Sequence, residues 1–74
     1  MSKLPVVSGD QLCTILRKMG YLIDHQTGSH IVLRQEGAPH RRLTVPDHKE
    51  IAKGTLRSII REAGLSVDEF KELL

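Results

Sequence analysis

Aromatic residues and cysteine are scarce in this chain of 74 residues, which contains one Tyr, one Phe, one Cys and no Trp. Proteins that stack RNA bases on a sheet need several exposed rings, so Tyr21 and Phe70 alone argue against that mode of recognition. The single Cys13 excludes an intramolecular disulfide framework and suits a reducing cytoplasm. Cys13 lies near the apolar face of an expected helix, which favours a packing role over that of a reactive thiol.

Long apolar runs are also missing. No segment approaches the roughly 20 residues of a membrane span, and the N-terminal MSKLPVV lacks the long apolar core of a signal peptide. We therefore expect a cytoplasmic protein without a membrane partner. With 39% apolar and 27% charged residues, the composition is that of a globular protein, and the length predicts a single domain over residues 1–74.

The formal net charge of +2 is unevenly distributed along the chain. Residues 1–33 carry +1, residues 34–61 carry seven bases and three acids for a charge of +4, and residues 62–74 carry −3. A basic middle segment suits a polyanion such as nucleic acid. A solvated surface of mixed charge would give the same pattern, and charge alone leaves both interpretations open.

Two capping boxes predict where helices begin. Ser8 and Gln11 form the first, and an apolar stripe at helical spacing follows it up to Gly20, which is expected to end the helix. Ser66 and Glu69 form the second, which opens a short helix at the C-terminus.

A further helix is expected ahead of the C-terminal one. Its apolar face is marked by four residues at helical spacing: Leu56, Ile59, Ile60 and Ala63. Gly64 is expected to end this helix, and Thr55 is expected to cap its start.

Three segments have the composition and alternation of strands, namely residues 21–26, 30–35 and 42–45. Turns are expected at 27–29 and 36–39, and Pro46 is expected to stop the third strand. The order α-β-β-β-α with a short terminal helix predicts an α+β fold. In this fold the helices cover one face of a three-stranded antiparallel sheet and leave the other face open to solvent.

The open face of the expected sheet would carry His30, Arg34 and Arg42 together. His30 directly follows the Gly28-Ser29 turn. An exposed histidine at the edge of a strand can be an ordinary surface residue. Basic side chains and the free amides of a turn are also the components of a phosphate site, and the pattern leaves both interpretations open.

Three short motifs occur in the order and spacing of a known family. They are Gly28-Ser29-His30, Val45-Pro46-Asp47-His48 and the segment KGTLRSII at residues 53–60. On these motifs the chain resembles the HicA (YcfA-like) toxins, which are mRNA interferases of type II toxin–antitoxin modules. The resemblance covers nearly the whole chain.

The resemblance implies a double-stranded-RNA-binding-domain-like fold and an endoribonuclease activity that depends on the motif histidine, here His30. It also implies mRNA as the substrate and a HicB-like antitoxin as the partner that masks the site. We expect no cofactor and no metal ion.

One histidine can suffice for RNA cleavage because RNA carries its own nucleophile, the 2′-hydroxyl. An imidazole that titrates near neutral pH can take up this proton or protonate the leaving 5′-oxygen. Cations and amides must then hold the charge of the phosphorane, and the candidates are Arg34, Arg42 and the backbone of Gly28 and Ser29. The expected products are a 2′,3′-cyclic phosphate and a free 5′-hydroxyl.

The remaining candidate residues have more open roles. His48 matches the family motif, and it could anchor its loop by hydrogen bonds or act as a second acid–base group. Lys53 and Arg57 could contact an RNA backbone at the start of their helix. His25 and His40 are expected to be plain surface residues, and the spacing of the histidines does not suit a zinc site.

Two rival functions remain open beside the endoribonuclease. One is a non-catalytic RNA-binding module of the same fold, in which His30 and the arginines only hold phosphates. The other is an interaction domain whose open sheet face binds a protein. The position of His30 directly after the Gly28-Ser29 turn favours the enzyme over both.

Overall fold

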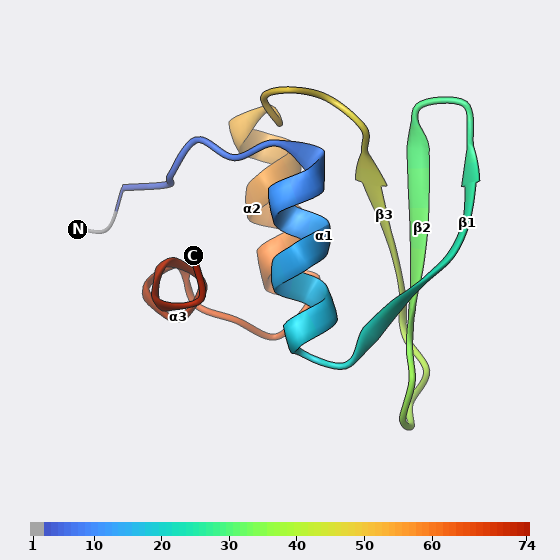
Figure 1. Cartoon of the computed structure of the whole chain (residues 1–74). Helices are drawn as coiled ribbons and strands as arrows, with labels where there is room; N and C mark the ends of the chain where they lie inside the picture. The colour runs from blue at the N-terminus through green and yellow to red at the C-terminus, as the bar shows by residue number, and fades with distance from the viewer. Residues whose placement is uncertain (1–2) are drawn as a thin grey trace.

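The computed structural model describes residues 3–74, and its elements follow the expected order (Figure 1). They are α1 (Gly9–Lys18), β1 (Tyr21–Thr27), β2 (His30–Gln35), β3 (Arg42–Pro46), α2 (Lys53–Glu62) and α3 (Val67–Glu72). The strands form one antiparallel sheet in the order β1-β2-β3. Helices α1 and α2 lie on one side of this sheet, and α3 lies farther from it (Figure 1). The expected α+β, double-stranded-RNA-binding-domain-like fold is confirmed.

Both capping boxes form as expected. The Ser8 hydroxyl accepts a hydrogen bond of 3.1 Å from the Gln11 amide, and the Gln11 side chain accepts one of 2.9 Å from the Ser8 amide. Ser66 and Glu69 make the same pair of bonds at the start of α3. Because each box satisfies two backbone donors that a helix leaves unpaired, it defines the first turn of its helix.

The start of α2 differs from the expectation. Thr55 does not cap this helix, because α2 begins two residues earlier at Lys53, with Ala52 as an N-cap whose side chain makes no hydrogen bond. The buried residues of α2 are Leu56, Ile59 and Ile60. Packing of this apolar face, rather than a polar cap, therefore sets where α2 lies.

The strands run slightly past the expected turns. Strand β3 ends at Pro46 as expected, and Pro46 is its last residue, paired with His30. A proline is tolerated there because β3 is an edge strand and needs no amide on its outer side. Thr27 also pairs with His30, across the β1–β2 hairpin. The hairpin loop is therefore only Gly28 and Ser29, and Gly28 has the positive φ of +57° that such a two-residue loop requires.

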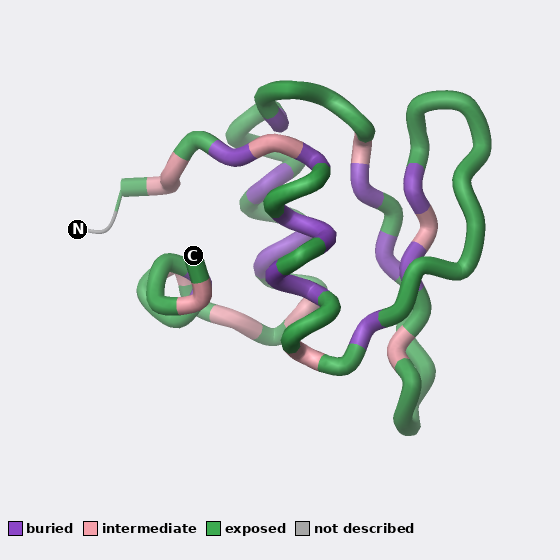
Figure 2. The backbone as a smooth tube through the Cα atoms, in the orientation of Figure 1, coloured by how far each residue is buried: buried purple, intermediate pink, exposed green. Residues whose placement is uncertain are grey.

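One apolar core fills the space between the sheet and the helices. Alternate residues of β2 and β3 point into it: Ile31, Leu33, Leu43 and Val45. Cys13 is also buried there, which raises the pKa of its thiol and agrees with a packing role. Strand β1 differs, because it buries only Tyr21 and leaves the rest of its length and the hairpin turn exposed (Figure 2).

Candidate active site on the outer face of the sheet

His30 is the first residue of β2 and lies on the solvent-facing side of the sheet. Its neighbour Ile31 is buried in the core, so His30 points to the opposite face together with Val32 and Arg34. The imidazole is exposed and makes no hydrogen bond with any residue from 3 to 74. It is therefore open to a ligand.

The turn before His30 presents two unused amides. The carbonyl of Ser29 accepts a hydrogen bond of 2.7 Å from the Asp47 amide, and the carbonyl of Gly28 accepts one of 3.1 Å from the Gln26 side chain. The amides of Gly28 and Ser29 have no partner in the part of the chain that the structure describes. Unpaired amides beside an imidazole can bind the oxygen atoms of a phosphate.

A clamp formed by Gln26 and Asp47 holds this turn against the loop that follows β3. The Gln26 amide nitrogen donates both to the Gly28 carbonyl and to Asp47 Oδ2, at 3.1 Å each. Sequence reasoning missed both residues. The place of Asp47 inside the Val45-Pro46-Asp47-His48 motif was a signal that could have identified it, whereas Gln26 carries no such signal.

His48 lies in that same loop and is anchored through its backbone. Its carbonyl accepts a hydrogen bond of 2.8 Å from the amide of Gly9 at the start of α1. A side chain at Gly9 would collide with the Pro46 carbonyl oxygen, so the close approach of α1 to this loop requires glycine. The His48 imidazole is exposed and has no hydrogen bond within residues 3–74, so the ring itself does not anchor the loop.

The expected cations do not all gather around His30. Arg34 and Arg42 pair with each other across β2 and β3. Arg34 is four residues from His30 along the strand, which places the two about 13 Å apart on the same face. Helix α2, whose first residue is Lys53, starts at the end of the molecule where the β1–β2 turn lies (Figure 1). Arg57 lies on the helical side, in a depression that it shares with Leu65 and with Val67 of α3.

A comparison with protein families identifies a family that shares the motifs of this site. A family model described as "HicA toxin of bacterial toxin-antitoxin" matches residues 9–65, which is more than half of the chain and includes all three motifs. The chain belongs to the HicA toxin family. It is thus a toxin of a toxin–antitoxin module, and membership implies an antitoxin partner. A comparison with curated proteins finds no match.

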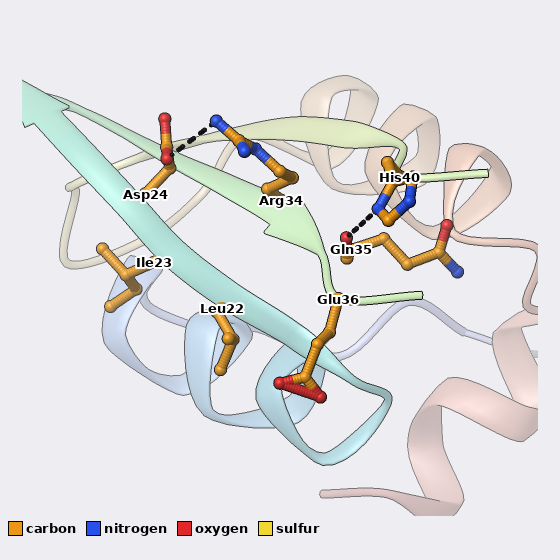
Figure 3. Close-up of a pocket in the computed structure, with 7 residues that line it drawn as sticks. All are labelled: Leu22, Ile23, Asp24, Arg34, Gln35, Glu36 and His40. Carbon is orange, nitrogen blue, oxygen red and sulfur yellow. Dashed lines mark hydrogen bonds and ion pairs between the residues drawn. The ribbon is translucent and has the colours of Figure 1, made fainter. Parts of the chain in front are cut away.

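This HicA-family chain also has a charged cluster at the other end of its outer sheet face. Asp24 lies at a β-bulge in β1, where the pairing with β2 shifts between Ile23 and His25. Its carboxylate accepts a hydrogen bond of 2.8 Å from His25 Nδ1. It accepts a second one of 3.1 Å from Arg34 Nη2 (Figure 3). The hydrogen bond from His25, followed by the charges of Arg34 and Arg42, holds the pKa of Asp24 below its ordinary value.

The described residues of this HicA-family toxin contain no group of three or more His, Cys, Asp or Glu side chains arranged to hold a metal ion. Among the same residues, no helix is long and apolar enough to cross a membrane.

Proposed function

We propose that this HicA-family toxin is an endoribonuclease, an mRNA interferase, in which His30 acts as the general acid or base. The observation that supports this proposal is the exposed imidazole of His30 beside two amides that have no partner among the described residues. An acid–base group and anion-binding donors at one point are what transesterification of RNA requires.

The reaction needs no nucleophile from the protein. The 2′-hydroxyl of a ribose attacks the adjacent phosphorus, so that a bond from O2′ to phosphorus forms and the bond from phosphorus to O5′ breaks. His30 takes the proton from O2′, and the leaving O5′ receives a proton from the resulting imidazolium or from His48. Positioned acid–base help of this kind accelerates a reaction by roughly 10²- to 10⁴-fold.

The negative charge of the phosphorane needs donors as well as a base. The amides of Gly28 and Ser29 are our candidates for this role, because preorganised donors stabilise charge that develops in the transition state. Lys53 at the same end of the molecule, together with Arg34, Arg42 and Arg57 farther away, would hold other phosphates of the RNA. This mechanism is metal-independent, since the RNA supplies the nucleophile and His30 the base.

The proposed partner is a HicB-like antitoxin that covers His30. Because the proposed substrate is mRNA, we place this activity in the cytoplasm. An acidic antitoxin surface would associate quickly with the cationic side chains of the outer sheet face by electrostatic steering.

The proposal is tested by replacing His30 with Ala in the purified protein. Cleavage of RNA should fall to background while the melting temperature stays near that of the wild type, because an exposed side chain contributes little to the core. The control is His40→Asn, which removes another exposed imidazole and keeps a residue that tolerates the φ of +58° at this position.

Three results of this test would count against the proposal or limit it. A His30→Ala protein that cleaves at the wild-type rate removes His30 from the mechanism. A His30→Ala protein that unfolds gives the residue a structural role. A wild-type protein that binds RNA without cleaving it favours the non-catalytic RNA-binding module.

A further inference from the structure

Two arginines face each other on the outer surface of the sheet. Arg34 of β2 pairs with Arg42 of β3, and both side chains are exposed. Like charges directly opposite one another on neighbouring strands are destabilising. The guanidinium of Arg42 has no hydrogen bond or ion pair among residues 3–74 that would offset this repulsion. The two guanidinium groups therefore repel each other across the strands.

Asp24 forms a close ion pair with Arg34 but not with Arg42. Its Oδ1 lies 3.1 Å from Arg34 Nη2, and in Figure 3 the two side chains point toward each other from neighbouring strands. The side chains of Arg34 and Asp24 are 46% and 29% exposed. An ion pair this open to water is weak and can exchange its anion for another. A phosphate is such an anion, and the fork of an arginine matches its geometry.

The distance of Arg34 and Arg42 from His30 indicates what kind of ligand they would bind. The β2–β3 pairing is regular from His30 to Arg34, so His30, Arg34 and Arg42 lie on one face of the sheet. The backbone positions of His30 and Arg34 are about 13 Å apart along β2, which is too far for a single phosphate and suits a polyanion with phosphates at intervals.

We propose that Arg34 and Arg42 form a second phosphate subsite for single-stranded RNA, and that Asp24 occupies Arg34 until an RNA phosphate displaces it. This inference rests on the proposed function, because it takes RNA to be the ligand at His30. It deepens that function in two ways. The RNA must extend beyond the nucleotides at the cleavage point to reach the subsite, and Asp24 lowers the affinity for RNA.

The test measures binding of a single-stranded octanucleotide with 2′-O-methyl groups, which cannot be cleaved because its nucleophile is blocked. Fluorescence anisotropy over a range of salt concentrations gives the affinity and its salt dependence. The variants are Asp24→Asn, Arg42→Gln and the control Glu72→Gln, which removes one exposed acid from α3. A melting curve is recorded for each variant.

Asp24→Asn should raise the affinity by up to about fivefold, because the competing anion of an exposed pair is removed. Glu72→Gln should change it much less. Arg42→Gln should lower the affinity and reduce the slope of log K against log salt by about 0.7, the value for one phosphate contact on a single strand. Its melting temperature should stay equal or rise, since the repulsion with Arg34 is relieved. A defect in folding would not give this combination.

Four other outcomes separate the subsite from the proposed function, and the first three of them overturn the subsite. If wild-type protein cleaves RNA while Asp24→Asn binds no better than Glu72→Gln, the subsite is wrong and the proposed function stands. If Arg42→Gln leaves RNA binding unchanged and weakens the complex with the antitoxin, the arginines serve the protein partner. If no variant binds RNA, the subsite and the proposed function fail together. If Asp24→Asn gains affinity while the wild type shows no cleavage, the subsite stands without the enzyme.

Discussion

Three consecutive basic residues, His40, Arg41 and Arg42, have three different environments in this chain. His40 lies in the β2–β3 turn with a φ of +58°. Arg41 donates a hydrogen bond of 3.1 Å to the Glu62 carbonyl at the end of α2, where a cation interacts favourably with the helix dipole. Only Arg42 points to the outer face of the sheet. The sequence alone could not predict which of these basic residues faces outward, because this depends on strand register and on the position of α2.

Gly9 is expected to be intolerant of a side chain, and Gly54 offers a matched comparison. A Cβ at Gly9 would collide with the backbone of Pro46, whereas a Cβ at Gly54 has no atom within 4 Å. Gly9→Ala should destabilise the protein by about 1–3 kcal/mol. Gly54→Ala should stabilise it by up to about 1 kcal/mol, because alanine is the better helix former. Urea unfolding measures both, and equal effects of the two substitutions would contradict the close contact at Gly9.

The Asp24 carboxylate predicts a specific pH dependence of stability. Because its pKa is lowered in the folded state by His25 and Arg34, the stabilisation is present above the ordinary aspartate pKa of about 3.9. It is lost as the pH falls through the lowered value. The difference in unfolding free energy between wild type and Asp24→Asn should therefore shrink from pH 6 to pH 3. A difference that grows toward low pH would show that the paired carboxylate is not its source.

The helix starts and the contacts between loops differ in how far the sequence predicts them. Ser8 and Ser66 cap their helices through residues three positions away, so a short motif contains all the information. The clamp joins Gln26 to Asp47, residues 21 positions apart, and it depends on the hairpin meeting the loop after β3. The bulge at Asp24 is equally dependent on pairing with a second strand. Such features follow from the assembled sheet rather than from local pattern.

The clamp formed by Gln26 and Asp47 should affect the rate of RNA cleavage, because it holds the turn that positions His30. In Gln26→Glu both hydrogen-bond donors are lost and a second carboxylate lies beside Asp47. We expect kcat to fall with little change in KM or in melting temperature, because the turn that carries His30 is released. Asp47→Asn keeps an oxygen that can accept from Gln26, so it should remain close to the wild type. The measurement is steady-state cleavage of one RNA by both variants, and equal rates would rule out a positioning role for Gln26.

The molecule as a whole keeps its helices on one side of the sheet and leaves the other side exposed (Figures 1 and 2). This layer order could be predicted, because alternation in β2 and β3 puts one apolar face inward. The shared face of His30, Arg34 and Arg42 followed from the same alternation. Their separation along that face did not enter the prediction, and it is the reason for proposing two phosphate positions in place of one.

An antitoxin that covers the outer face should protect the whole domain. Binding only the folded state raises its stability, by about 2.7 kcal/mol at a ligand concentration 100 times the Kd. We expect the co-expressed antitoxin to raise the melting temperature, to stop RNA cleavage and to slow modification of His30 by a histidine-reactive reagent. Mass spectrometry of the modified peptides gives the rates. A complex in which His30 reacts as fast as in the free toxin would place the antitoxin elsewhere.

In the proposed reaction, His30 catalyses attack of the RNA 2′-hydroxyl without a metal ion. Its most direct test is the chemistry of the RNA ends produced by purified protein in excess chelator. We expect 2′,3′-cyclic phosphate and 5′-hydroxyl ends from the wild type, at a rate unchanged by chelator, and no such ends from His30→Ala. Products with 5′-phosphate ends, or cleavage that stops in chelator and returns with added Mg²⁺, would contradict it.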